Sequence, residues 1–349
     1  MRSSYRFGSA LAIMACVATL SVACGDGGEA TASDPSETTI AADGEVGTAE
    51  LTPVDGMNAD GAGTVPGGVS DDDVVGGQAI EIEEVPWTVA LVHPGESDNF
   101  CGGVLIAPTR VLTAAHCTQY VKRDSQTGKP IPGTEFVYGP AYINVVAGRT
   151  DLDDDTGQEV AVTMVWQHPD YDNEFFSNDY AFLDLAEPLN QTAIAVPPNT
   201  ATGLWGNNVL VDVAGWGCQL SNKASQPECE PGGSPLMTST FLAKDATWCR
   251  EDYGSIDSTT ELCLQNQSDD STSCNGDSGG PYTVEEETTH VKYVVALVSY
   301  GKRGCPHGVP VVGALLAPIL DGRGEISSGI LWTTCKGDPE PAQRCDYAA

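Results

Sequence analysis

The chain has 349 residues, and its 49 Asp and Glu against 16 Lys and Arg give a formal net charge of −33 at pH 7. Because nucleic acids and anionic membrane surfaces attract cationic proteins, so acidic a chain is not expected to bind either of them. The length exceeds that of one small domain, and the composition divides the chain into segments.

Residues 1–23 have the pattern of an export signal. Two arginines precede an apolar run at residues 10–20, which is too short to span a membrane comfortably. The signal ends in SVACG at residues 21–25, which resembles a bacterial lipobox, where a cysteine becomes the lipidated N-terminus. We expect Cys24 to anchor the exported chain to the bacterial cell envelope. Ordinary signal cleavage and secretion is the alternative.

Residues 24–73 form an acidic segment without an apolar pattern. It contains 12 Asp or Glu and no Lys, Arg or aromatic residue. Such a composition cannot bury enough apolar surface to offset the loss of chain entropy. The sequence predicts a disordered linker or propeptide here.

From residue 74 onward, short runs rich in Val, Ile and Leu alternate with Gly, Pro and Asn. Examples are residues 87–92, 142–147, 208–214 and 293–300. Short strands separated by turn residues predict an all-β barrel or sandwich.

Cysteine usage agrees with export. Apart from Cys16 and Cys24, the chain has ten cysteines, and an even number in an exported chain predicts disulfides, five here. The sequence has no pair of Cys-x-x-Cys motifs and its His residues are scattered, so we expect no metal site.

Three short motifs supply the residue types of nucleophilic catalysis. In GDSGGP, Ser278 lies on a tight turn whose glycines allow positive φ and whose N–H groups can hold an oxyanion. In TAAHC, His116 adjoins a cysteine whose disulfide would hold it in place as a general base. In NDYA, Asp179 precedes an apolar strand and would orient the imidazole. Taken singly, each also fits a structural role, as a surface turn, a structural histidine or a strand-capping aspartate.

In this order, the three motifs resemble the signature blocks of the trypsin/chymotrypsin family of serine proteases. Further matching blocks are VVGG at 74–77, PW at 86–87, FCGG at 100–103, AGWG at 214–217 and SYG at 299–301. The resemblance covers about residues 74–333. It leaves residues 334–349 as a cysteine-containing tail whose fold is open, because residues 315–349 lack a clean terminal-helix pattern.

The resemblance implies an all-β fold of two packed six-stranded antiparallel β-barrels with the active site between them. It implies a monomeric serine endopeptidase that hydrolyses proteins or peptides and needs no cofactor. The chain order His, Asp, Ser argues against an α/β-hydrolase, in which the order is Ser, acid, His. The alternative function is that of a latent or non-catalytic binding protein with a protease fold.

The resemblance also implies roles for individual residues. His116 would take the proton of the nucleophile Ser278, and Asp179 would orient His116. The backbone N–H groups of Gly276 and Ser278 would form the oxyanion hole. Ser299 would support the aspartate and border the specificity pocket.

Substrate preference would depend on the pocket below the nucleophile. The resemblance puts Thr272 at its base and Gly301 and Gly308 at its walls. An open, neutral pocket favours large apolar or aromatic residues before the scissile bond. As alternatives, Asp269 and Asp270, close in sequence, would supply a negative charge, while Lys302 and Arg303 would favour acidic groups nearby.

The resemblance implies proteolytic activation. Cleavage between Asp73 and Val74 would free the ammonium of Val74 to pair with Asp277, and a buried pair is tolerable because each charge satisfies the other. No Lys or Arg precedes this bond, so the sequence does not identify the activating protease.

The cysteine pairs implied by the resemblance are Cys101–Cys117, Cys249–Cys263 and Cys274–Cys305. Spacing suggests Cys218–Cys229 and Cys335–Cys345, and a bond from Cys218 or Cys229 to the tail is the alternative. The acidic loop at residues 151–155 lies where some relatives bind calcium. Because Arg149 replaces the first carboxylate ligand, we expect a solvated loop, with calcium as the alternative.

Overall fold

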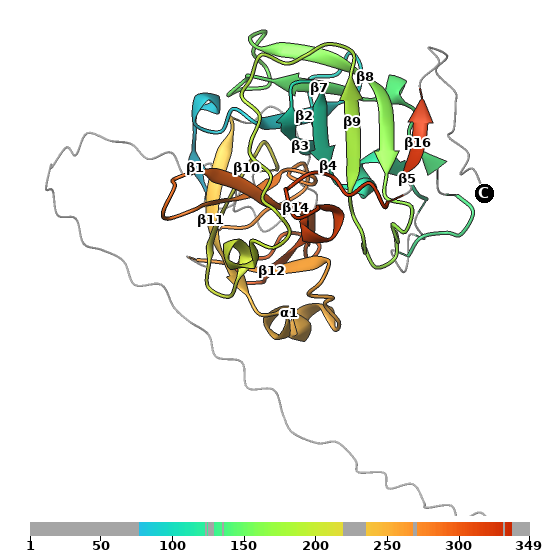
Figure 1. The fold of residues 1–349 in the computed structure, drawn as a ribbon. Coiled ribbons are helices and arrows are strands. Elements are labelled where there is room, and N and C mark those ends of the chain that lie inside the picture. Colours follow the sequence, from blue (N-terminus) through green and yellow to red (C-terminus); the bar gives the residue numbers. More distant parts are fainter. Residues whose placement is uncertain are drawn as a thin grey trace, which may run out of the picture. The chain divides into compact units, whose positions relative to one another are not determined.

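Antiparallel β-strands dominate the computed structural model of the chain (Figure 1). The structure describes residues 77–122, 124, 129–134, 136–218, 235–267, 271–330 and 332–336. All of them belong to one compact unit, Gly67–Ala349. The expected export signal and acidic segment, with Cys24 and Val74, lie outside the described residues, as do Cys229 and Cys345.

Six strands close the first barrel. Their order is β8-β7-β2-β3-β4-β9, and a further pairing of β8 with β9 completes the ring. The strands are β2 (Thr88–Val92), β3 (Asn99–Ala107), β4 (Arg110–Thr113), β7 (Asn144–Ala147), β8 (Gln158–Gln167) and β9 (Ala181–Leu185). The seventh strand of this sheet, β16 (Thr333–Lys336), pairs antiparallel with β8.

The second barrel is also closed by six strands. Their order is β11-β10-β13-β14-β15-β12, and β11 also pairs with β12. The strands are β10 (Leu210–Gly215), β11 (Met237–Lys244), β12 (Glu261–Asn266), β13 (Pro281–Glu285), β14 (Lys292–Tyr300) and β15 (Val311–Leu315). β1 (Gln78–Ala79) adds to β11 at the outside. The two six-stranded antiparallel barrels expected from the sequence are therefore confirmed.

Side-chain alternation explains why these segments form barrel strands. Along β11, buried and half-exposed residues alternate at every position, which is the period of two that directs one strand face into a core. β2 is buried at all five positions, and its sequence TVALV accordingly lacks polar alternation. Each barrel has its own apolar core.

A third apolar cluster joins the barrels. Val104 and Leu112 of the first barrel pack with Leu297 and Ala314 of the second, and all four are at most 3% exposed. Burying a leucine or valine side chain contributes about 1.5–3 kcal/mol. This shared core holds the two barrels, which carry the residues of the candidate site, against each other.

The remaining elements are short. α1 (Ala246–Tyr253) is the one α-helix among the described residues, and the Asp245 carboxylate caps it by accepting from the Thr247 N–H. The 3₁₀ turns are η2 (Ile82–Glu84), η3 (Ala115–Thr118), η4 (Pro140–Tyr142), η5 (Thr202–Trp205) and η6 (Ala317–Ile319), and β5 (Gln119–Tyr120) pairs with β6 (Phe136–Val137). Within the described part of the chain, none of the helices has the length and apolarity needed to cross a membrane.

The C-terminal boundary differs from the expectation. The sequence predicts that the protease domain ends at residue 333 and the tail begins at residue 334. In the structure, β16 runs across this boundary, and Cys335 is buried in the first-barrel core. The first residues assigned to the tail therefore belong to the first barrel's sheet. Cys335 and Cys218 are both disulfide-bonded, and their expected partners Cys345 and Cys229 are not among the described residues.

Candidate active site

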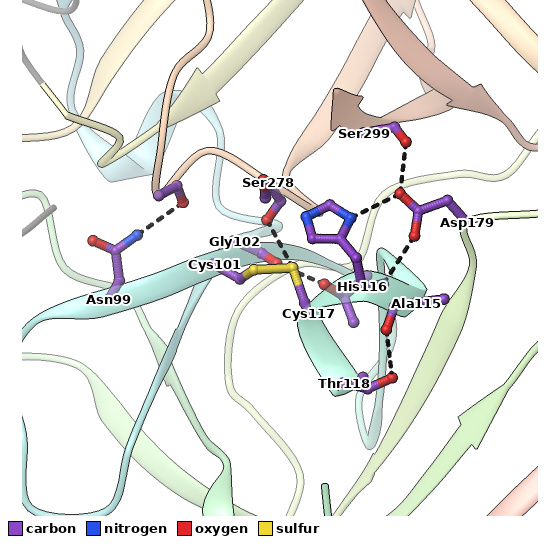
Figure 2. The surroundings of a disulfide bond; sticks show 12 residues. Asn99, Cys101, Gly102, Ala115, His116, Cys117, Thr118, Asp179, Ser278 and Ser299 are labelled. Atoms are coloured by element: carbon purple, nitrogen blue, oxygen red, sulfur yellow. Dashed lines mark hydrogen bonds and ion pairs between the residues drawn. A yellow bond between two sulfur atoms is a disulfide. The ribbon is translucent and has the colours of Figure 1, made fainter. Parts of the chain in front are cut away.

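A cavity of about 730 Å³ lies where the two barrels meet. From the first barrel's side it is lined by His116, and from the second by Thr272 and Ser278. His116, Asp179 and Ser278 come from distant positions in the sequence: His116 and Ser278 line the cavity, and Asp179 lies buried behind His116 and bonds to it (Figure 2).

Asp179 holds His116 by two hydrogen bonds. Its Oδ1 accepts the His116 backbone N–H at 2.9 Å, and its Oδ2 lies 2.8 Å from the ring Nδ1. Ser299 donates its hydroxyl to the same Oδ2 at 2.6 Å. Asp179 is fully buried, whereas the His116 side chain is 20% exposed. Nδ1 is thus engaged, and Nε2 is the ring nitrogen left to act as a base.

Local structure explains these positions. η3 directly follows β4 and carries His116, and Asp179 stands two residues before β9, the strand that pairs with β4. The Cys101–Cys117 disulfide links the residue after His116 to β3. In the view of Figure 2 the imidazole lies between Asp179 and Ser278.

Ser278 lies on a glycine-rich turn that contacts the first barrel directly. Its carbonyl accepts the Gly102 N–H at 2.7 Å. Gly279 has φ of 80°, and a Cβ there would overlap the Thr113 hydroxyl. The second glycine of the motif is therefore required both by backbone conformation and by the close approach of β4.

Two N–H groups of this turn are available for a ligand. Asp277, Gly279 and Gly280 each donate their N–H to a backbone carbonyl. Within the described residues, the N–H groups of Gly276 and Ser278 donate to no protein acceptor. These are the two donors that the sequence assigned to the oxyanion hole.

Asp277 is a buried carboxylate held by backbone groups. It is 4% exposed and accepts the Gly217 N–H at 2.8 Å and the Cys274 N–H at 2.9 Å. Burial raises its pKa to about 6, although both hydrogen bonds oppose the shift. No cationic side chain of the described residues forms an ion pair with it.

Three of the four residues expected in the specificity pocket line the cavity. Thr272, Ser299 and Gly301 line the cavity, but Gly308 does not, and a Cβ on Gly308 would meet no atom within 4 Å. Val311 lines the cavity as well, and its Cγ1 lies 3.3 Å from the position of a Cβ on Gly301. The branched side chain of Val311 therefore lines the cavity in addition to the expected residues.

Three disulfides have the pairing implied by the resemblance. They are Cys101–Cys117, Cys249–Cys263 and Cys274–Cys305. The one described group of His, Cys, Asp and Glu with metal-ligand spacing is Cys101, His116 and Cys117. Both sulfurs of that group are in a disulfide, so they are not available as thiolate ligands.

Arg149 occupies the acidic loop considered for calcium. Its Nε donates to the Thr156 carbonyl at 2.6 Å and an Nη to the Leu152 carbonyl at 3.3 Å. The Asp151 carboxylate caps the turn by accepting the Asp153 N–H. The Arg149 guanidinium thus binds carbonyl oxygens of this loop.

Aromatic residues around His116 were missed at the sequence level. Phe176 has φ of 57°, and its ring lies 5.6 Å from both the His116 ring and the Tyr300 ring. Tyr120 of β5 and Tyr138, the residue after β6, also line the cavity. The pair of phenylalanines just before the NDYA motif was the available signal for the first of these.

Two closed six-stranded barrels, with a serine and an aspartate-bonded histidine lining one shared cavity, are typical of a class of serine endopeptidases. The Trypsin family model matches residues 74–321. The chain belongs to the trypsin family and is a serine-type endopeptidase.

Similar proteins span bacteria and animals. A trypsin of Saccharopolyspora erythraea is 30% identical over 248 residues, covering 71% of this chain and 95% of that protein. A trypsin of Squalus acanthias is 29% identical, covering 60% and 80%. Coagulation factor IX of Cavia porcellus is 29% identical, covering 66% and 73%. The disulfides fit an extracellular protein, as is common for trypsin-like proteases.

Proposed function

We propose that this serine protease acts through Ser278, His116 and Asp179. Ser278 attacks the peptide carbonyl carbon as its hydroxyl proton moves to Nε2 of His116. The tetrahedral intermediate then collapses, the C–N bond breaks, and His116 gives the proton to the leaving amine. Water repeats the sequence on the acyl ester and restores the serine. The observation that carries this assignment is the buried Asp179 carboxylate bonded to both the backbone N–H and the ring Nδ1 of His116.

The oxyanion would bind at Gly276 and Ser278. Their N–H groups have no protein acceptor among the described residues, and a preorganised donor of this kind contributes about 3–4 kcal/mol to transition-state stabilisation. The negative oxygen would replace water at these donors, while neighbouring N–H groups keep the turn rigid.

Activation would come from cleavage between Asp73 and Val74 by a protease that the sequence does not identify. The Asp277 carboxylate is desolvated, and its two hydrogen bonds come from neutral backbone groups. A buried carboxylate is costly unless it is paired with a cation. The freed ammonium of Val74 would supply that charge and stabilise the turn that carries Gly276 and Ser278.

The pocket would favour small aliphatic residues before the scissile bond, whereas the sequence alone predicts large apolar or aromatic ones. Val311 lines the cavity, and its Cγ1 lies 3.3 Å from the position that a Cβ on Gly301 would take. Thr272 is neutral and 3% exposed, so it offers no charge to Lys or Arg. Substrates with Ala or Val should therefore exceed those with Phe or Lys in kcat/KM. Val311→Gly should raise kcat/KM for Phe substrates about tenfold, because even one methylene in an apolar pocket changes discrimination by about tenfold or more.

A fluorophosphonate serine probe tests the catalytic assignment. The chain from Met1, the chain from Val74 and a Ser278→Ala variant of the latter are compared for labelling. We expect the Val74 form to be labelled far faster than the Met1 form and the variant not at all. Folded protein that resists labelling in both forms would favour the latent or binding-protein alternative.

The monomeric, envelope-anchored form of the protein is part of the same proposal. The SVAC sequence before residue 25 supports lipidation, and cleavage before Val74 would release the protease from the anchor. Palmitate incorporation in a bacterial host should be lost in Cys24→Ala. Equal incorporation in both chains would exclude Cys24 as the anchor.

A further inference from the structure

The oxyanion donor Gly276 is held from three directions. The Cys218 N–H donates to the Asn275 carbonyl at 2.7 Å. The neighbouring Gly217 N–H donates to the Asp277 carboxylate at 2.8 Å. From the first barrel, the Asn99 side chain donates to the Gly276 carbonyl at 2.9 Å, as the dashed line at Asn99 in Figure 2 indicates.

The first of these bonds fixes the direction of the oxyanion donor. The Asn275 carbonyl and the Gly276 N–H belong to one peptide group, which is planar and trans, so the two point in opposite directions. Holding the carbonyl toward Cys218 therefore turns the Gly276 N–H away from Cys218. A rotation of this peptide would withdraw the donor without moving Ser278.

Cys218 is in turn held by its sulfur. It is disulfide-bonded and 5% exposed. Its side chain packs in one buried cluster with Cys274 and Cys305, which are bonded to each other. Gly217 and Cys218 lie two and three residues after the end of β10 at Gly215, so the disulfide adds a covalent restraint to the segment that bonds to the Ser278 turn.

We propose that Cys218 is a positioning residue for catalysis, and that its disulfide keeps the Asn275–Gly276 peptide oriented for oxyanion binding. The residue touches no substrate atom and acts through the Asn275 carbonyl. The inference rests on the proposed role of Gly276 as an oxyanion donor. It predicts a loss of turnover without a loss of substrate affinity, because the hydrogen bond from the Gly276 N–H to the substrate oxygen strengthens only as that oxygen becomes an oxyanion.

The test compares two disulfide variants in the form that begins at Val74. Cys218→Ser breaks the proposed anchor. Cys335→Ser breaks another disulfide-bonded, buried cysteine, but one in the first-barrel core and outside the cavity lining. In both variants the released thiol is capped with iodoacetamide, and both are assayed well below their melting temperatures.

We expect Cys218→Ser to lower kcat about tenfold or more, a fraction of the loss that removal of a donor causes, with KM changed less than about twofold. The inhibition constant of a peptide aldehyde, whose adduct carries an oxyanion, should rise by the same factor as kcat falls. Cys335→Ser should leave kcat and the inhibition constant near wild type even if its melting temperature falls.

Equal kcat in the two variants would overturn the proposal, as would a Cys218→Ser loss confined to KM. Failure of the underlying function is distinguishable, because the wild-type form would then neither turn over substrate nor react with the fluorophosphonate probe.

Discussion

The two barrels provide their parts of the site by different means. The first barrel contributes side chains: the fully buried Asp179 carboxylate accepts from the ring of His116. The second barrel contributes the hydroxyls of Ser278 and Ser299 and also uses its main chain: Gly276 and Ser278 offer N–H groups on a turn held by backbone hydrogen bonds. Side-chain identity can be read from a sequence, whereas the direction of an N–H depends on neighbours far along the chain. The two halves should therefore fail in different ways.

The largest effect is expected in the side-chain half. Asp179→Asn keeps the size and shape of the side chain. Its amide N–H would donate to Nδ1 of His116, so the ring proton would be on Nε2. That tautomer cannot accept the Ser278 proton, so kcat should fall by about 10³- to 10⁴-fold while the fold persists. Steady-state kinetics with circular dichroism as the control measures this. Retention of a tenth of the activity would mean that Asp179 does not set the tautomer.

In the turn that carries Ser278, adding a single methyl group should lower the free energy of unfolding. Gly279→Ala would place a Cβ on the Thr113 hydroxyl and near the Gly102 carbonyl, at a φ of 80°. Strain and overpacking together should cost about 3–4 kcal/mol in the free energy of unfolding, measured in urea.

Gly304→Ala is the matched control for that change. Gly304 has φ of 81°, and a Cβ there meets no atom within 4 Å. It should cost only the backbone strain, about 1–2 kcal/mol. If the two variants had the same free energy of unfolding, the close contact between the Ser278 turn and β4 would not contribute to the cost of Gly279→Ala.

The same contrast explains what could be predicted from the sequence. Three short motifs predicted His116, Asp179 and Ser278 as candidate catalytic residues, because each proposed role needs one side-chain type. The barrels could be predicted from strand-length apolar runs and from the resemblance. Both depend on local composition, which a single sequence displays directly.

The pocket wall and the oxyanion anchor could not be predicted in this way. Gly308 and Val311 are three residues apart, and strand register decides which one faces Gly301: β15 begins at Val311, paired with Leu264 of β12. Cys218 acts through its backbone N–H, which every residue except proline carries. A long-range pairing and a peptide orientation leave no mark on residue type.

The buried Asp277 should make the stability of the turn in the second barrel depend on pH. Its pKa, raised to about 6 by burial, means that the native chain binds the proton more tightly than the unfolded chain does. Its contribution therefore favours folding at low pH and is lost as pH rises from about 4 to about 6, by about 3 kcal/mol.

That loss is measured in the chain from Met1, where Val74 offers no ammonium. The difference in unfolding free energy between wild type and Asp277→Asn should change by about 3 kcal/mol between pH 4 and pH 7, in favour of the variant at pH 7. In the Val74 form the ammonium would pair with the carboxylate and reduce this change. A pH-independent difference in the Met1 chain would contradict the burial of an unpaired carboxylate.

The smallest effect concerns the charge of the cavity. In a chain with 49 acidic residues, no Asp or Glu is among the described residues that line the cavity, whereas Lys302 and Arg303 are. Lys302 is bonded to Asp252, which leaves Arg303 to attract an acidic substrate group. An exposed charge of this kind contributes up to about 1 kcal/mol.

Arg303→Glu should therefore lower kcat/KM for peptides with Glu near the scissile bond about fivefold relative to their Gln counterparts, mostly through KM. The difference should shrink in 1 M salt, because the Debye length falls to about 3 Å. Arg323→Glu makes the same change in net charge at a residue outside the cavity lining, paired with Asp321 and Glu325. Since the whole-protein field changes equally in both variants, an equal effect of the two would mean that the protein's total charge, and not the cavity's own cation, selects acidic substrates.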